Sequence, residues 1–147
     1  MKKAILLAAL LLAAPSVKAG IDAKSDTYCL ALTGFTEARD QGAHGMALVM
    51  HTVMTRARNR NKTPCQIAYQ PNQYHGVLFW PRNKDPRSVN EASWSLAVRI
   101  ANSLDQFNFG SCSGATHFYA PAVVSRQPRW SNTIPFKCTY RGHRFYG

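Results

Sequence analysis

The pattern of hydrophobic residues changes once along this chain, near Gly110, and that change limits the folds open to it. Before Gly110, apolar side chains recur every three or four residues, which predicts amphipathic helices. After Gly110, two short, aromatic-rich segments bounded by turns, 115–121 and 138–147, favour strands. This order predicts an α+β fold, with N-terminal helices followed by a short antiparallel sheet.

Three long helices are predicted before Gly110, over residues 27–38, 43–60 and 88 to about 104. Ser25 or Asp26 can cap the first, and Ser88 with Glu91 forms a capping box for the third. Arginines collect in the last turn of the second helix, where they suit the negative end of the helix dipole, or alternatively touch substrate: Arg56, Arg58 and Arg60.

The connections are expected to be mostly irregular. Pro64 can open a short helix within residues 63–70. Residues 71–88 are rich in Pro, Asn and aromatic residues, which predicts a long loop with at most a short strand. Residues 122–137 carry Pro, Arg and Trp and are likewise expected to form a loop.

The first 19 residues have the layout of a secretory signal peptide. Lys2 and Lys3 precede an apolar run of about a dozen residues, and small residues at Val17 and Ala19 predict cleavage after Ala19. The run is short for a membrane span, which needs roughly 20 residues, although a retained signal-anchor is the alternative. We therefore expect export to the periplasm or the extracellular space, membrane contact only through this segment, and a single domain over residues 20–147.

Four cysteines follow the predicted signal peptide: Cys29, Cys65, Cys112 and Cys138. An even number in an exported chain predicts two disulfides, and the sequence leaves all three pairings open. A zinc site is the competing interpretation, but the chain has no CxxC or HxxxH pair with ligand spacing. We therefore expect neither a metal nor a cofactor.

The charge of the chain indicates an anionic partner. Its 18 Lys and Arg residues against 7 Asp and Glu give a formal charge of +11, and loss of Lys2, Lys3 and Lys18 with the signal would leave +8. Export argues against nucleic acid and favours the anionic cell envelope. The alternative is that the basic residues only keep the protein soluble. We expect a monomer.

Glu37 is one of two glutamates in the chain and has no ordinary structural explanation. It shares a helical stripe with Leu30, Thr33 and Gly34, in a helix that is nonpolar nearly all round and is therefore expected to be buried. Burial raises the pKa of a carboxyl and keeps it protonated near neutral pH, as a general acid requires. A salt bridge to Arg39 at an exposed helix end is the structural alternative.

Four motifs occur in order over roughly residues 29–146: TGFTEARDQGAHGMALVMHTVMTRARN, CQIAYQPNQY, THFYAP and GHRFYG. Together they resemble the SleB-type cell wall hydrolases, the spore-cortex-lytic enzyme family. The resemblance implies a small peptidoglycan-cleaving domain with a lysozyme-like substrate cleft, in which the glutamate of the Glu-Ala-Arg motif, here Glu37, is catalytic. Two departures from the family pattern are Tyr74 in place of phenylalanine and Ala120 in place of asparagine.

A single catalytic glutamate favours a lytic transglycosylase, in which the muramic acid C6 hydroxyl attacks C1 and closes a 1,6-anhydro ring. The enzyme would cleave the MurNAc-GlcNAc bond as a phage endolysin or a bacterial wall-remodelling enzyme. A lysozyme-type hydrolase would instead use Asp40 or Asp85 to activate water. A third interpretation is a non-catalytic basic protein that binds the wall or a membrane. A fourth is a zinc amidase built from histidines: His44, His51, His75, His117 or His143.

Five further residues are predicted to bind substrate: Gln73, Tyr74, His117, Tyr119 and His143. The first two lie in the glutamine-aromatic motif of the family. His117 and Tyr119 alternate on one predicted strand, so their side chains are expected to face the same side. His143 lies in the terminal motif, where a structural, hydrogen-bonded role is the alternative.

Overall fold

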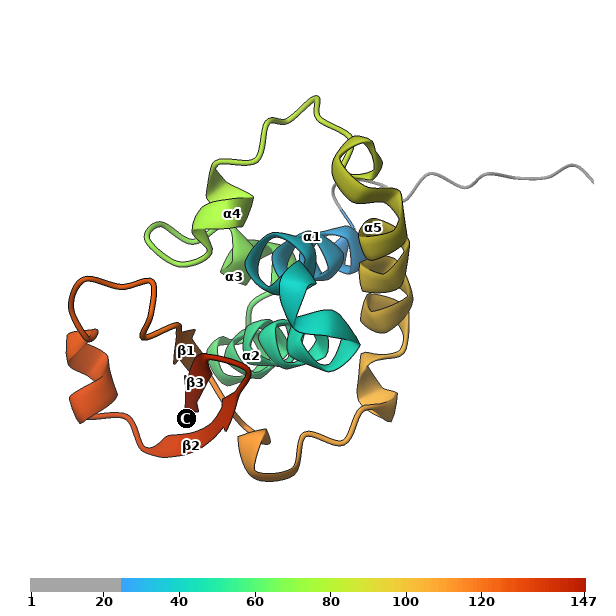
Figure 1. The fold of residues 1–147 in the computed structure, drawn as a ribbon. Helices are drawn as coiled ribbons and strands as arrows, with labels where there is room; N and C mark the ends of the chain where they lie inside the picture. The colour runs from blue at the N-terminus through green and yellow to red at the C-terminus, as the bar shows by residue number, and fades with distance from the viewer. Residues whose placement is uncertain (1–24) are drawn as a thin grey trace, which may run out of the picture.

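The computed structural model describes residues 25–147, and the predicted signal peptide lies outside this range. Helices occupy the first part of the described chain and three short strands the last part, which confirms the predicted α+β fold (Figure 1). The helices are α1 (Asp26–Ala38), α2 (Gly42–Arg60), α3 (Pro64–Ala68), α4 (His75–Leu78) and α5 (Arg87–Asn102). The strands are β1 (His117–Tyr119), β2 (Phe136–Tyr140) and β3 (His143–Tyr146). Within residues 25–147, no helix combines the length and hydrophobicity that a membrane crossing requires.

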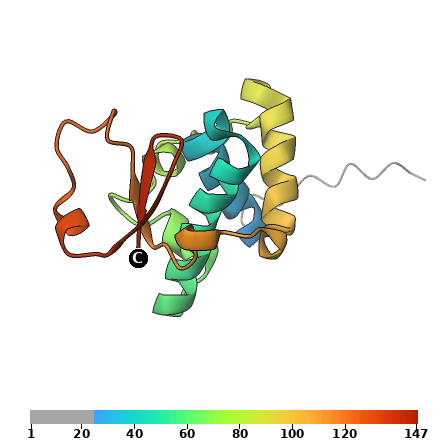
Figure 2. The ribbon, with the colours of Figure 1, turned by 60° about the horizontal axis from the view of Figure 1, so that its bottom comes forward.

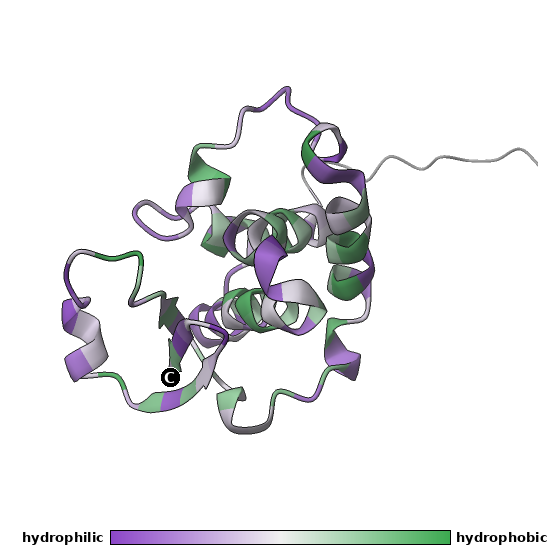
Figure 3. Cartoon of the chain, in the orientation of Figure 1, coloured by the Kyte–Doolittle hydropathy of each residue, from purple (hydrophilic) through white to green (hydrophobic). Residues whose placement is uncertain are grey.

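The central helix is α1, which packs against α2, α3, α4 and α5. Ser25 caps it, because its hydroxyl accepts a hydrogen bond from the Tyr28 N–H at 3.1 Å. All residues from 29 to 35 are buried, as the apolar character of this segment on every face predicts. Figure 3 shows hydrophobic residues recurring along α1, α2 and α5, whereas the connection over residues 81–86 is hydrophilic.

The second helix, α2, joins the helical core to the sheet. One side packs against α1, and Leu48 belongs to a second buried cluster together with Phe145 of β3. Figure 2 shows α2 between α5 on one side and the strands on the other. The helix ends at Asn61, whose φ of 50° is the left-handed conformation that commonly ends helices.

The strands form one antiparallel sheet in the order β1-β3-β2. β2 and β3 are joined by a tight turn in which Arg141 and Gly142 have φ values of 41° and 84°. Two successive residues with positive φ suit the two-residue hairpin turns whose twist matches that of the strands. The segment predicted as strand over 138–147 is therefore a hairpin, and β2 begins earlier, at Phe136.

The two predicted disulfides are present, and the structure selects their pairing. Cys29 of α1 is bonded to Cys65 of α3, and Cys112 is bonded to Cys138 of β2. The first bond ties two helices of the main core together. The second ties a turn after α5 to the sheet, so each disulfide staples one of the two buried clusters.

Two local predictions were wrong. The segment expected to be a loop over 71–88 contains α4, a helix of four residues that the sequence pattern is too short to reveal. The capping box of Ser88 and Glu91 does not form. Asn90 interrupts the helix with extended backbone angles (φ −160°, ψ 99°), and its side-chain oxygen accepts the Ser93 N–H at 2.9 Å. Asn90 thus caps the long part of α5, because asparagine is a strong cap itself.

Candidate active site

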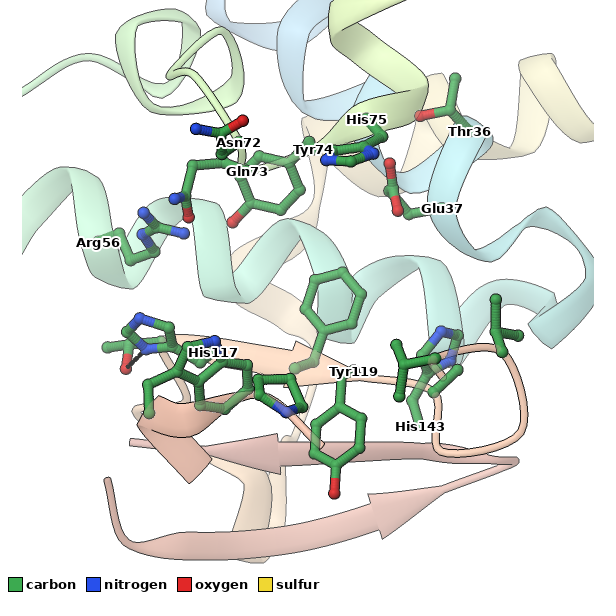
Figure 4. A pocket seen from close by; sticks show the side chains of 17 residues that line it. Thr36, Glu37, Arg56, Asn72, Gln73, Tyr74, His75, His117, Tyr119 and His143 are labelled. Atoms are coloured by element: carbon green, nitrogen blue, oxygen red, sulfur yellow. Dashed lines mark hydrogen bonds between the residues drawn. The ribbon is translucent and has the colours of Figure 1, made fainter. Parts of the chain in front are cut away.

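A cleft of about 540 Å³ is lined on one side by the helices and on the other by the sheet and its loops. One wall comes from the end of α1, from α2 and from residues 72–75, which lead into α4 (Figure 4). The opposite wall comes from β1, the loop that follows it and the start of β3. Glu37 and all five residues predicted to bind substrate line this cleft. The structure thus brings together residues that are as far apart in sequence as Glu37 and His143.

Glu37 lies in the last turn of α1, partly buried, and its carboxylate contacts the first turn of α4. The Gly76 N–H donates a hydrogen bond to Glu37 Oε1 at 2.9 Å. A Cβ atom at position 76 would lie 3.0 Å from this oxygen and 2.5 Å from Thr36 Cβ. Residue 76 must therefore be glycine for α4 to approach the carboxylate so closely.

Burial raises the pKa of Glu37 above its ordinary value of 4.5. The Gly76 hydrogen bond and the charge on His75 act in the opposite direction but do not cancel the effect of burial. The alternative of a salt bridge to Arg39 is wrong, because the Arg39 guanidinium lies over the Phe35 ring, 5.2 Å from its centre. In the described part of the chain, the ion pair that forms is Arg87 with Asp85, at 2.6 Å. Glu37 therefore has the environment of a proton donor.

The other carboxylates proposed for the hydrolytic mechanism do not line the cleft. Asp85 is exposed and bound to Arg87, and Asp40 is exposed at the 3-10 turn that follows α1. Among the described residues that line the cleft, Glu37 is the one carboxylate. The described residues of the cleft thus offer one carboxyl group that could act as an acid or a base, and no second carboxylate on the facing wall.

Gln73 and Tyr74 occupy different depths of the same wall. Gln73 is exposed at the rim, whereas Tyr74 is buried, with 3% of its surface exposed. The Thr52 hydroxyl donates to the Val49 carbonyl at 2.7 Å, so the Tyr74 hydroxyl donates to Thr52 Oγ1 at 3.2 Å. Burial raises the pKa of Tyr74, and its ring is fixed as part of the cleft wall.

On β1, His117 and Tyr119 face the same side, as the strand alternation predicts. Their rings lie 4.9 Å and 5.8 Å from the Trp130 ring. Figure 4 shows the Tyr119 hydroxyl pointing away from Glu37. Phe118, between them on the strand, faces the opposite side, as the same alternation predicts, and its ring centre lies 6.2 Å from that of Tyr74. Phe118 was not among the residues predicted from the sequence to bind substrate.

Two histidines of the cleft, His117 and His143, have lowered pKa values, which favours their neutral forms. Burial, reinforced by the charges of Arg56 and Arg60, lowers the pKa of His117 to about 4. Burial also lowers the pKa of His143, although Asp40 opposes this effect. The His143 ring lies 5.4 Å from that of Phe118, so it packs against the cleft wall rather than standing free.

The histidines considered for a zinc amidase do not converge on one point. His75, His117 and His143 line the cleft, whereas His51 lies elsewhere, with its Nε2 accepting the Gly114 N–H at 3.0 Å. Within residues 25–147, no group of three or more His, Cys, Asp or Glu side chains is arranged to hold a metal ion.

Arg56, which the sequence pattern placed at the end of a helix, contributes a positive charge to the cleft. Arg56, but not Arg58, lines the cleft, and only 5% of its surface is exposed. Its guanidinium lies 5.8 Å from the centre of the Tyr74 ring. Arg56 follows Thr52 by one helical turn and therefore lies on the same face of α2. With three arginines close together, the sequence alone did not show which of them faces the cleft.

Comparison with known proteins supplies independent information. A family model described as Cell Wall Hydrolase matches residues 40–146. The catalytic domain of the germination-specific lytic transglycosylase SleB from Bacillus anthracis has a similar fold, with a TM-score of 0.52 and 18% identity over 83% of this chain and 93% of that domain. No curated protein matches the sequence. The matched range begins after Glu37, so the case for this residue rests on the geometry above.

Proposed function

This chain belongs to the cell wall hydrolase family and degrades peptidoglycan; from that premise we propose that it is a lytic transglycosylase with one catalytic residue, Glu37. The bond cleaved is the MurNAc-GlcNAc glycosidic bond. One observation carries this proposal: the cleft contains a single carboxylate, partly buried, with a raised pKa and no ion pair to another described residue. A reaction that needs one acid–base group suits such a site.

The chemistry follows from the protonation state of Glu37. The carboxylic acid donates its proton to the glycosidic oxygen as the bond to C1 of MurNAc breaks, and the bonding electron pair leaves with the GlcNAc hydroxyl. The resulting carboxylate then accepts the proton of the MurNAc C6 hydroxyl while O6 bonds to C1. This step closes the 1,6-anhydro ring, restores the acid and consumes no water.

The Gly76 N–H supports both halves of this cycle. Its hydrogen bond at 2.9 Å fixes the direction of the carboxyl group and stabilises the ionised form that must act as a base. Burial favours the protonated form that must act first. Burial and this hydrogen bond thus act in opposite directions on the pKa of Glu37, which suits a group that must first donate a proton and then accept one.

The opposite wall would hold the sugar rings. Trp130 and His117 offer partly exposed rings against which a pyranose can pack, with the buried Tyr119 supporting Trp130 from behind, and the exposed Gln73 can bond to an acetamido group or a hydroxyl. Burial lowers the pKa of His143, and its neutral ring can donate one hydrogen bond and accept another. Two disulfides and a basic surface suit an exported protein that works on the anionic wall.

The test is cleavage of purified peptidoglycan, followed by mass spectrometry of the products. We expect fragments that end in anhydro-muramic acid, one water lighter than the reducing ends that a hydrolase leaves. Glu37→Gln should lower the turnover by about a thousandfold, because general acid catalysis contributes roughly 10²–10⁴. Glu91→Gln, which removes an exposed glutamate on α5, is the matched control and should retain full activity.

Each result has a definite meaning. Reducing ends would overturn the transglycosylase assignment in favour of a hydrolase. Full activity of a folded Glu37→Gln variant would overturn the role of Glu37. Wall binding without any product would indicate a non-catalytic wall-binding protein.

A further inference from the structure

Arg56 is a buried cation with no anionic partner among the described residues. Only 5% of the surface of this residue is exposed to solvent. The ion pair found in residues 25–147 joins Arg87 and Asp85, so no carboxylate lies within salt-bridge distance of Arg56. An arginine keeps its charge in proteins, and a buried charge without a partner is costly. The guanidinium therefore needs a counter-ion, and the described residues of the chain do not supply one.

The hydrogen bonds around Arg56 point to the same deficit. Arg56 Nη2 donates to Gln70 Oε1 at 3.2 Å, and Arg60 Nη1 donates to the same oxygen at 3.0 Å. Two guanidinium groups thus share one neutral amide oxygen, and the other side chain that hydrogen-bonds to Arg56, the Tyr74 hydroxyl, is also neutral. Arg56 Nε is buried and has no hydrogen-bond partner in the described structure. The rigid fork of an arginine matches a carboxylate, which accepts two parallel bonds.

The location of Arg56 relates it to the proposed reaction. In Figure 4, Arg56 and Glu37 lie at opposite ends of one wall of the cleft, with Gln73 and Tyr74 between them. On the facing wall, His117 is uncharged at neutral pH, because its pKa is lowered to about 4. The positive charge that lines this end of the cleft therefore comes from Arg56, and Arg60, which does not line the cleft, shares its Gln70 partner.

We propose that Arg56 forms an anion subsite for a carboxylate carried on the lactyl arm of the muramic residue. The proposal rests on the function proposed above and defines its substrate as an acidic glycan strand. Such a carboxylate has two sources. A peptide attached to the arm carries its own carboxylates, whereas an arm without a peptide ends in the lactyl carboxylate itself. Binding this group at one end of the cleft positions the strand so that a glycosidic bond reaches Glu37.

The experiment compares three soluble substrates prepared from one batch of glycan strands. The first keeps its acidic peptides, the second has all carboxylates converted to primary amides, and the third is stripped of peptides by an amidase. The wild-type protein, Arg56→Gln and Arg58→Gln are assayed for kcat/KM on each. Arg58 lies in the same turn of α2, is exposed and does not line the cleft, so its variant changes the net charge equally.

The expected result is a preference that depends on Arg56. Wild type and Arg58→Gln should cleave a carboxylate-bearing strand roughly ten- to a hundredfold better than the amidated strand, and Arg56→Gln should lose this preference. Faster cleavage of the peptide-bearing strand than of the stripped strand identifies the peptide carboxylate as the group that Arg56 binds. Faster cleavage of the stripped strand identifies the lactyl carboxylate. Equal cleavage of all three strands by wild type would overturn the subsite and leave the proposed function intact.

Two measurements keep the test decisive. Dissociation constants of Glu37→Gln for the three strands report the subsite without catalysis. If no strand is cleaved, the proposed function fails, and these constants still decide whether the carboxylate is bound. If Arg56→Gln does not fold, as judged by thermal unfolding, the wild-type comparison of acidic and amidated strands decides. Arg56→Lys, which keeps the charge without the fork, should restore only part of the preference.

Discussion

Glu37 and Arg56, at the two ends of the cleft, are ionisable groups that respond to burial in different ways. Glu37 is partly buried and Arg56 is buried, and neither forms an ion pair with another described residue. A carboxyl group can respond by keeping its proton, and burial accordingly raises the pKa of Glu37. A guanidinium cannot lose its charge, so Arg56 remains a cation in need of an anion. Burial thus favours the proton-donor role proposed for Glu37 at one end and the anion binding proposed for Arg56 at the other.

Gly76→Ala tests whether the close contact between α4 and Glu37 matters, and it carries the largest expected effect of the three predictions that this comparison yields. The added Cβ meets Thr36 and Glu37 Oε1, so α4 must move away and the carboxyl group loses its fixed direction. We expect kcat to fall by about a hundredfold, which is the cost of displacing a catalytic group by about 1 Å. KM for acidic strands should change little, because the Arg56 end is untouched.

The control for Gly76→Ala is His75→Ala on the same helix, which leaves the Gly76 N–H in place. It should retain most of the turnover. An unchanged kcat in a correctly folded Gly76→Ala variant would show that the contact between α4 and Glu37 does not matter to the reaction.

The pH dependence of kcat/KM should separate the two ends. A general acid must be protonated, so the rate falls as the pH rises through the raised pKa of Glu37, and half-maximal activity lies above pH 4.5. His75→Ala should move this limb to higher pH, because the charge of His75 lowers the pKa of Glu37. Arg56→Gln should weaken cleavage of acidic strands without moving the limb. A limb at or below pH 4.5 would contradict the assignment of Glu37 as a buried acid.

The smallest effect concerns stability. The pKa of Glu37 is higher in the folded than in the unfolded chain, so the folded state binds more protons between these values. The free energy of unfolding therefore falls as the pH rises from 4.5 through the folded pKa. Glu37→Gln escapes this loss, and its amide oxygen can still accept the Gly76 N–H. Its melting temperature should exceed that of wild type by a few degrees at pH 7 and approach it at pH 4.

Calorimetry of both proteins at pH 4 and pH 7 checks this prediction. The lowered pKa values of His51, His117 and His143 destabilise both proteins at acid pH and so cancel in the comparison. The same melting difference at both pH values would contradict a raised pKa for Glu37.

Local sequence signals predicted the parts of the fold that depend on neighbouring residues. The periodicity of α1 and α2 and the cap at Ser25 were predicted correctly, and the burial of residues 29–35 follows from their composition. Where two local signals competed, the prediction failed, because Asn90 rather than Ser88 caps the long part of α5. The four residues of α4 carry too little periodicity to be recognised, and their packing against α1 stabilises them instead.

The sequence by itself determined the order of helices and strands, the number of disulfides and the choice of Glu37 as the exceptional carboxylate. Periodicity and composition depend on residues that are close together in the sequence, so they can be recognised without knowledge of the fold. Only the tertiary structure decided that Cys29 pairs with Cys65, that Gly76 reaches Glu37 across 39 positions and that Arg56 faces the cleft. These contacts join distant segments, and their energy depends on how helices pack and what they exclude from water.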